Sequence, residues 1–273
     1  MTFSSKLLDV KNLRKMVLDM AFSGQAVHIG CAFSIIELLA VLYRTHLRYP
    51  GNDVMATNRD YLVLSKGHGV MAQYACMREM GWLETEDLTN YFVDGSALKG
   101  LSDSRIPGLE VTSGSLGHGF SVGVGMSMAA KLRGTDQKTY ALVGDGEINE
   151  GPIWEGMLFA SHHELSNFMA VVDVNGFQAM GRTDEVINLG SIQSKFISFG
   201  FETITVDGHD EVAIDGAINT LWSSKSSSPK ALIAKTIKGK GVSFMENNNI
   251  WHYTRLNKQT YDQALAELAF SLS

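Results

Sequence analysis

The alternation of apolar and polar positions divides the chain into helical and extended segments. Residues 6–22 carry apolar side chains at helical spacing, which predicts an amphipathic helix. Ser34 followed by Glu37 has the pattern of a capping box, so we expect a helix to begin there and continue through IIELLAVLYRTHL. Further helices are expected in GVMAQYACMREMG, which ends at Gly81, in LETEDLTNYF, and over residues 117–133.

Continuous apolar runs predict buried strands between these helices. The runs are YLVLS (61–65), TYALVG (139–144), FMAVVDV (168–174), FETITVDG (201–208) and KALIAKTI (230–237). Because they are continuous rather than alternating, the fold class we expect is α/β, a parallel sheet covered by helices on both faces. The Ser-rich stretch 223–229 fits a loop between a helix and a strand. We therefore expect a single domain over residues 1–273.

Composition excludes several classes of function. With 273 residues and 45% hydrophobic content, the chain can build a sizeable core. A net charge of −6, with no basic cluster beyond KTIKGKG, argues against nucleic-acid binding. No uncharged run approaches about 18 residues, so no membrane span is expected. Cys31 and Cys76 lack any metal-ligand spacing, which favours core residues in a reducing compartment, and we expect a cytoplasmic protein.

A motif that suits a metal and a phosphate follows two of the predicted strands. Gly144, Asp145 and Gly146 end one strand, and Asn175 ends the next, one strand–helix–strand crossover later. Neighbouring parallel strands would bring Asp145 and Asn175 together where such sheets bind ligands. Mg²⁺ often takes only one or two protein oxygens and the rest from phosphate and water. The glycines let backbone N–H groups approach a diphosphate. An aspartate in a tight turn and a strand-capping asparagine are the structural alternative.

Five ordered motifs resemble those of the transketolase family. GDGEINEG…WEG followed by VVDVNGF is similar to the thiamine-diphosphate motif. Ahead of it, SGQAVHIGCAFS, RDYLVLSKGHG and PGLEVTSGSLGHGFSVGVGMSMA resemble family segments, and after it KTIKGKGVSFMENNNIWH resembles the end of the family's first domain. Together they cover residues 14 to 254. Because the chain has the length of that first domain alone, it resembles the N-terminal subunit of the split transketolases.

The resemblance implies thiamine diphosphate and Mg²⁺, or Ca²⁺ or Mn²⁺ in its place, as cofactors. Asp145 and Asn175 would bind the metal through their side chains and Phe177 through its carbonyl oxygen. The residues implied at the organic cofactor are His68, Gly114, Ser115, Leu116, Gly144, Gly146, Lys238 and His252. For Lys238, a solvated loop lysine remains the alternative.

Three of the eight histidines fall in matching motifs. The resemblance places His68 and His252 at the diphosphate and His28 toward the substrate. A pKa near neutrality would suit these imidazoles to proton transfer with sugar hydroxyls.

Three glutamates follow the metal motif, and we expect them on the helix after the turn. The resemblance implies that Glu150 and Glu155 lie where two active sites meet across the subunit interface and share protons there. Glu147 suits the N-terminus of a helix, whose dipole favours an acidic side chain.

The implied activity is that of a transketolase-like transferase, which moves a two-carbon ketol unit from a ketose to an aldehyde. The implied partner is a second subunit with the pyrimidine-binding domain, the C-terminal domain and the catalytic glutamate. Homodimerisation through the cofactor-site helices would give a heterotetramer. The substrate would be a small-molecule sugar. Leu101 stands where the family has a histidine that contacts the donor sugar, and WHYT replaces the usual WHG, so we expect a modified sugar. Alternatives are a 2-oxo acid decarboxylating component or a noncatalytic cofactor-binding subunit.

Overall fold

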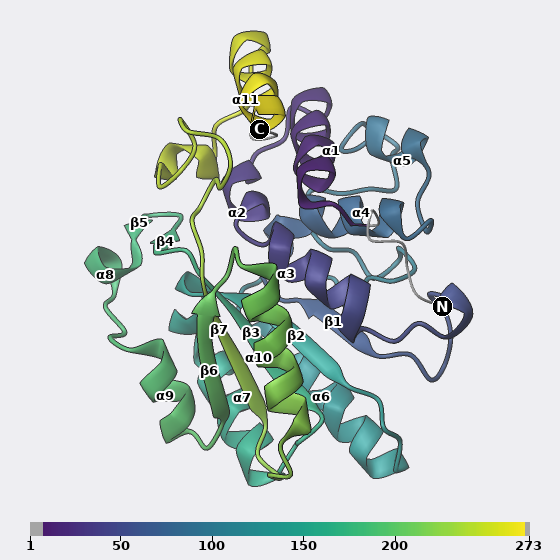
Figure 1. Ribbon diagram of the computed structural model, residues 1–273, viewed down its shortest axis with the longest axis vertical. Coiled ribbons are helices and arrows are strands. Elements are labelled where there is room, and N and C mark those ends of the chain that lie inside the picture. The colour runs from purple at the N-terminus through teal and green to yellow at the C-terminus, as the bar shows by residue number, and fades with distance from the viewer. Residues whose placement is uncertain (1–7, 271–273) are drawn as a thin grey trace.

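A parallel sheet of five strands forms the centre of the computed structural model, which describes residues 8–270. Its order is β1-β2-β3-β7-β6, and every pairing is parallel (Figure 1). The strands are β1 Tyr61–Leu64, β2 Thr139–Gly144, β3 Phe168–Val174, β6 Glu202–Asp207 and β7 Lys230–Lys235. All five expected strands are confirmed. Ser223 ends a helix, and residues 224–229 are the loop that leads into β7, as expected for this Ser-rich stretch. A short hairpin, β4 Phe177–Gln178 and β5 Gly181–Arg182, follows β3.

Successive residues of each central strand enter two different cores, which explains the continuous apolar runs. In β2, Tyr140 and Leu142 belong to one core, while Ala141 and Val143 belong to the other, and all four are fully buried. A strand with both faces buried has no position left for an exposed polar side chain. The expected parallel α/β sheet with cover on both faces is confirmed.

Helices cover each face of the sheet. The first core takes side chains from α1 Val10–Ser23, α2 Ile29–Phe33, α3 Ile36–Val41, α4 Val70–Glu79, α5 Thr85–Thr89, α10 Glu211–Ser223 and α11 Lys258–Phe270. The second core takes side chains from α6 His118–Arg133, α7 Gly151–His162 and α9 Ile192–Ser198. Figure 1 shows α10 in front of the sheet, with α6 and α7 behind it. The short helix α8 Thr183–Val186 follows the β4–β5 hairpin.

Two details at the start of the chain differ from expectation. The first helix begins at Val10, where the Asp9 side chain accepts hydrogen bonds from the N–H groups of Lys11 and Asn12; residues 6 and 7 lie outside the described residues. The prediction that Ser34 and Glu37 form a capping box is wrong. Ser34 instead closes α2, and its hydroxyl donates to the Asp173 carboxylate (2.7 Å). The carboxylate of Glu37 pairs with Arg14 from another helix, so neither side chain is available to cap α3.

Tight packing fixes the turn that leads from β1 to α4. A Cβ atom on Gly67 would lie 2.4 Å from Oγ and 2.5 Å from the carbonyl oxygen of Ser113. The Ser113 hydroxyl in turn donates to the Leu64 carbonyl at the end of β1 (2.7 Å). The turn therefore has room only for glycine, and it delivers Lys66 and His68 to the carboxyl edge of the sheet. Among residues 8–270, no helix has the length and apolar character needed to cross a membrane.

Candidate active site

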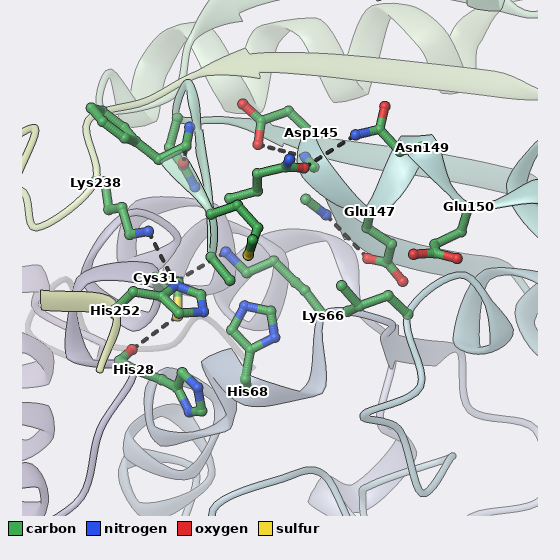
Figure 2. A pocket seen from close by; sticks show the side chains of 18 of the residues that line it. His28, Cys31, Lys66, His68, Asp145, Glu147, Asn149, Glu150, Lys238 and His252 are labelled. Carbon is green, nitrogen blue, oxygen red and sulfur yellow. Dashed lines mark hydrogen bonds between the residues drawn. The ribbon is translucent and has the colours of Figure 1, made fainter. Parts of the chain in front are cut away.

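A cavity of about 530 Å³ opens at the carboxyl ends of β1, β2, β3 and β7. Figure 2 shows the histidines, Cys31 and Lys238 on one side, the acidic residues and Asn149 on the other, and Lys66 between them. The predicted site residues that line it are His28, His68, Leu101, Gly114, Leu116, Gly144, Asp145, Gly146, Glu147, Glu150, Asn175, Phe177, Lys238 and His252. One cavity therefore collects residues from all five motifs.

Asp145 follows β2 directly and is only 3% exposed. Its carboxylate accepts hydrogen bonds from the N–H groups of Gly146 (2.8 Å) and Gly176 (2.6 Å). Burial, joined by the charge of Asp173, raises the pKa of Asp145 to about 7. A charged carboxylate is thus unfavourable at this position unless a cation lies beside it.

Asn175 lies beside Asp145, as expected for neighbouring parallel strands. In the β2–β3 pairing Gly144 stands opposite Asp173, so both strands end at the same edge. Asn175 donates from Nδ2 to the Asp173 carboxylate (2.8 Å), and its Oδ1 accepts from the Phe177 N–H (3.0 Å). These bonds fix the orientation of the amide. Carboxylate, carboxamide and carbonyl oxygens are the hard donors that suit Mg²⁺, so the residues present fit that ion.

A buried ion pair lies behind the predicted metal ligands. Lys66 donates to the Asp173 carboxylate (2.6 Å) and to the Cys31 carbonyl (3.0 Å). Burial raises the pKa of Asp173, but the ammonium of Lys66 and several hydrogen bonds outweigh it and lower that pKa overall. Asp173 therefore stays charged beside the Lys66 ammonium. Within residues 8–270 the Asp145 carboxylate has hydrogen bonds but no ion pair.

The sequence predicted Glu147 on the helix after the turn, and this prediction is wrong. Glu147 belongs to the short 3-10 turn Gly146–Asn149 and is 2% exposed. Its carboxylate accepts from the Ser65 hydroxyl (2.5 Å) and from the N–H groups of Gly117 (2.8 Å) and Gly144 (3.2 Å). Burial raises its pKa despite these bonds. Glu147 thus joins the ends of β1 and β2 to the start of α6.

The three predicted histidines converge. Ring centroids are 5.3 Å apart for His28 and His68, 5.0 Å for His28 and His252, and 5.6 Å for His68 and His252. Burial, together with nearby lysines, lowers the pKa of His28 to about 4 and of His252 to about 3, and it holds the pKa of His68 well below its usual range. The expectation of values near neutrality is therefore wrong for the site without its ligand. These imidazoles are neutral at physiological pH, and a bound anion would raise their pKa values.

His28 has an unusual backbone. Its φ of 71° lies in the left-handed region, a conformation that costs energy in residues other than glycine. The His28 N–H donates to the His252 carbonyl (3.0 Å), and the Cys31 thiol donates to the His28 carbonyl (2.9 Å). The strained residue is thus held in place from two directions within the cavity.

Lys238 reaches the cavity rather than solvent. Its ammonium group donates to Asn249 Oδ1 (2.7 Å) and to His252 Nδ1 (3.1 Å), which leaves the His252 proton on Nε2. The ammonium also lies 5.7 Å from the centre of the Phe177 ring. Burial lowers the pKa of Lys238. The solvated-loop alternative is thus wrong.

The remaining predicted residues lie toward the rim. Glu150 precedes α7 rather than lying on it, and it is exposed at the edge of the cavity. Glu155 lies on α7, exposed and outside the cavity lining. Ser115 shares a loop with Gly114 and Leu116 but is also exposed and outside the lining. The proton-sharing role of the two glutamates across an interface stays a prediction.

Several residues of the site carry no signal of their own in the sequence. Lys66 and Asp173 lie inside two of the motifs, yet only their pairing across the sheet shows that they matter. Cys31 is buried, as expected, but it also lines the cavity. Tyr253 is exposed at the cavity rim, with its ring 5.2 Å from that of His28.

Fold and site together define an α/β protein with a polar cavity at the carboxyl edge of a parallel sheet, where proteins of this class bind their ligands. The family model described as "Transketolase, thiamine diphosphate binding domain" matches residues 5–272. The chain therefore belongs to the transketolase family and represents its thiamine-diphosphate-binding domain.

Two relatives are transketolase subunits of comparable length. One, from the apulose-4-phosphate transketolase of Phocaeicola vulgatus, is 37% identical over 257 residues, which cover 94% of this chain and 91% of that protein. The other, SqwG from the 6-deoxy-6-sulfo-D-fructose transketolase of Clostridium sp., is 35% identical, with 94% and 93% covered. The resemblance to the N-terminal subunit of split transketolases, which are transferases, is confirmed.

Solved transketolases share the fold. The enzyme from Campylobacter jejuni superposes with a TM-score of 0.88 at 30% identity, over 96% of this chain and 42% of that one. The Leishmania mexicana enzyme gives 0.87 at 26% identity, over 97% and 41%. The chain thus spans about two fifths of the length of these solved transketolases.

Proposed function

We propose that the chain is the cofactor-binding subunit of a two-subunit transketolase that transfers a two-carbon ketol unit between a ketose and an aldehyde. The observation that carries this proposal is the convergence of five sequence motifs on one cavity at the carboxyl edge of the sheet. When bound, thiamine diphosphate supplies the nucleophilic carbon and the electron sink, and the protein supplies positioning and electrostatics.

We assign the metal to Asp145, Asn175 and the Phe177 carbonyl, with Mg²⁺ as the ion and Ca²⁺ or Mn²⁺ as substitutes. The raised pKa of Asp145 supports this assignment, because a divalent cation stabilises the charged carboxylate.

We assign the diphosphate to His68, Lys238, His252 and the glycines Gly144 and Gly146. Their cavity holds an ammonium with uncharged partners, and imidazoles that could donate hydrogen bonds to a bound anion, which would also favour their protonated form. Gly114, Ser115 and Leu116 would line the rings of the cofactor.

The proposed substrate is a modified sugar. Leu101 lines the cavity and is 42% exposed, so an apolar group faces the space where the family has an imidazole. Leucine cannot hydrogen-bond a sugar hydroxyl. A site without such a partner favours a donor sugar in which that hydroxyl is absent or attached at another position. The name of the Clostridium relative, with its 6-deoxy-6-sulfo sugar, supports this direction. His28, with its neutral imidazole, would contact the substrate and exchange protons with its hydroxyls.

The proposed partner is a second subunit that carries the pyrimidine-binding domain, the C-terminal domain and the catalytic glutamate. The names of the relatives, which call them subunits, support a second chain. We further propose a heterotetramer that forms through α6 and α7. These packed helices expose large apolar side chains at Val122, Leu132, Leu158 and Phe159. Glu150 and Glu155 would share protons across that interface.

We propose the cytoplasm as the location, because Cys31 and Cys76 are both free thiols.

The test is calorimetric titration of thiamine diphosphate, with and without Mg²⁺, into the reconstituted pair of subunits. Asp145→Ala is expected to abolish Mg²⁺-dependent binding while the circular dichroism spectrum is unchanged. Wild-type affinity in that variant would refute the metal assignment. Cofactor binding without ketol transfer on any sugar tested would favour the noncatalytic alternative, and turnover of a 2-oxo acid would favour the decarboxylating one.

A further inference from the structure

A buried polar network lies outside the cavity, on the far side of the segment that carries Lys238. Arg14 of α1 donates to the Glu37 carboxylate of α3 (2.6 Å), and His209, in the turn between β6 and α10, bonds the second oxygen of Glu37 (3.1 Å). The side chains of Arg14, Glu37 and His209 are 6%, 7% and 11% exposed. None of the three lines the cavity, and no step of the proposed function uses them.

Geometry determines which nitrogen of His209 carries the proton. The backbone N–H of Ile237 points at His209 Nε2 (2.8 Å), and an N–H group can only donate. Nε2 is therefore the acceptor, and the imidazole is neutral with its proton on Nδ1. That proton is donated to Glu37. Burial raises the pKa of Glu37, but His209 and Arg14 outweigh it and lower that pKa overall, so Glu37 is the anion that orients the ring.

Both ends of the network bind the backbone on either side of Lys238. His209 accepts from the Ile237 N–H, one residue before Lys238. Arg14 Nε donates to the Lys240 carbonyl (3.0 Å), two residues after it. The network therefore fixes the segment after β7 from which the Lys238 side chain extends into the cavity.

Lys238 needs such support because no ion pair holds its ammonium group in the part of the chain that the structure describes. Within residues 8–270 its hydrogen bonds go to Asn249 and to His252, which is neutral because burial and then Lys238 itself lower its pKa. A lysine side chain has four rotatable bonds and loses much freedom when it is held in one position. A fixed backbone reduces the number of positions the ammonium can reach.

We infer that the Arg14–Glu37–His209 network is a positioning device for Lys238 and so sets the affinity of the site for a diphosphate. The inference rests on the proposed function, which takes Lys238 to contact the diphosphate. A buried ion pair is weak evidence for stability alone, since apolar side chains of similar volume often serve as well or better. The hydrogen bonds of this network to the backbone of Ile237 and Lys240 hold the chain on both sides of Lys238, which favours a positioning role.

Two substitutions of His209 separate its two hydrogen bonds. His209→Gln places an amide near the Nε2 position and can still accept from Ile237, whereas His209→Asn reaches only the Nδ1 position. Arg14→Lys keeps the charge beside Glu37 but loses the bond to the Lys240 carbonyl. Each is made with Lys238 present and in a Lys238→Met background. Thiamine diphosphate affinity with Mg²⁺ is measured by calorimetry on the reconstituted pair of subunits, and the melting temperature is measured without cofactor.

Lys238→Met alone is expected to weaken binding about tenfold or more, as for a lost hydrogen bond to a charged group. His209→Asn and Arg14→Lys are each expected to weaken it at least threefold, His209→Gln to restore most of the affinity, and all three to have no further effect once Lys238 is Met. Equal weakening in both backgrounds would show a general effect on the fold and would overturn the inference, as would a His209→Asn protein with wild-type affinity. Should one variant not fold, the other end of the network gives the same test.

A different result would refute the assignment of Lys238 to the diphosphate as well. If Lys238→Met leaves the affinity unchanged, Lys238 does not contact the diphosphate, and both the assignment and the inference built on it are wrong. If Lys238→Met weakens binding but the network variants do not, only the positioning inference fails.

Discussion

Asp145 and Asp173 are two buried aspartates of one site, and the structure predicts opposite consequences when each is changed to asparagine. Asp145 has its pKa raised from 3.8 to about 7, whereas the pKa of Asp173 is lowered. A raised pKa in an acid means that the folded state holds its proton more tightly than the unfolded state. The charged carboxylate of Asp145 therefore destabilises the metal-free fold, and that of Asp173 stabilises it.

The magnitude for Asp145 follows from its shift and its hydrogen bonds. At about 1.4 kcal/mol per pH unit, a shift of about three units corresponds to about 4 kcal/mol of destabilisation above pH 7. Asparagine removes that penalty but can accept only one of the two bonds from Gly146 and Gly176, which costs about 1–3 kcal/mol. Asp145→Asn should therefore raise the free energy of unfolding by about 1–3 kcal/mol above pH 7. The gain should decline as pH falls from 7 to about 4, because the folded carboxyl is then protonated and the unfolded one approaches its own pKa of 3.8.

The Asp173→Asn variant is the matched control. It leaves the Lys66 ammonium buried without its carboxylate, and breaking such a pair typically costs about 3–5 kcal/mol. This loss should be complete at neutral pH and should disappear only in acid, as pH falls through the lowered pKa of Asp173.

The assay is urea unfolding of the full chain with a chelator present, followed by circular dichroism over about pH 2 to 8. Wild type, Asp145→Asn and Asp173→Asn are compared at each pH. If Asp145→Asn destabilises the protein at neutral pH as much as Asp173→Asn does, the carboxylate of Asp145 is not an electrostatic cost, and the argument that it awaits a cation is refuted.

Three further predictions concern packing, specificity and assembly. Gly67→Ala should lower the free energy of unfolding by about 1–3 kcal/mol, because the added Cβ would clash with Ser113. Gly216→Ala is the control: this glycine has open space around it on α10, so alanine should raise the free energy of unfolding by up to about 1 kcal/mol. Urea titration measures both, and a Gly67→Ala protein of wild-type stability would contradict the packing argument. Leu101→His should raise kcat/KM for xylulose 5-phosphate with ribose 5-phosphate about tenfold in a coupled assay of the reconstituted pair, and no change would count against a donor-sugar contact at this position. The purified chain alone should show no ketol transfer and should gain it when the second subunit is added, so turnover by the single chain would disprove the shared site.

The strands and the main helices were predictable because their signals are local. Each buried strand is a continuous apolar run, and each run ends close to the residue where the strand ends. The Ser34 capping box failed because its residues have partners far away in the chain: the serine hydroxyl bonds Asp173 and the glutamate bonds Arg14. A local pattern cannot show that a distant side chain competes for the same atoms.

Residues of the candidate site were predictable only where they belong to a recognised sequence motif. Asp145, Asn175 and the three histidines stand in recognisable segments and converge as expected. Glu147 lies in a 3-10 turn instead of on the expected helix, because nothing near it in the sequence shows that Ser65 and Gly117 will surround its carboxylate. The pKa values predicted for the three histidines were wrong for a related reason. Their imidazole side chains become buried only when the ends of several strands come together in the fold. His209 gave no signal, because its partners lie on α3 and after β7.

The order of the strands in the sheet has a consequence for how the chain acquires its structure. Strand β7 is the last of the five in sequence, yet it lies between β3 and β6, and β6 pairs with β7 alone in the described part of the chain. While a ribosome delivers the chain from its N-terminus, β6 therefore has both edges unpaired until residues 230–235 have emerged. Unpaired edges of this kind attract other chains. The newly made protein should depend most on chaperones in this interval, before β7 enters the sheet.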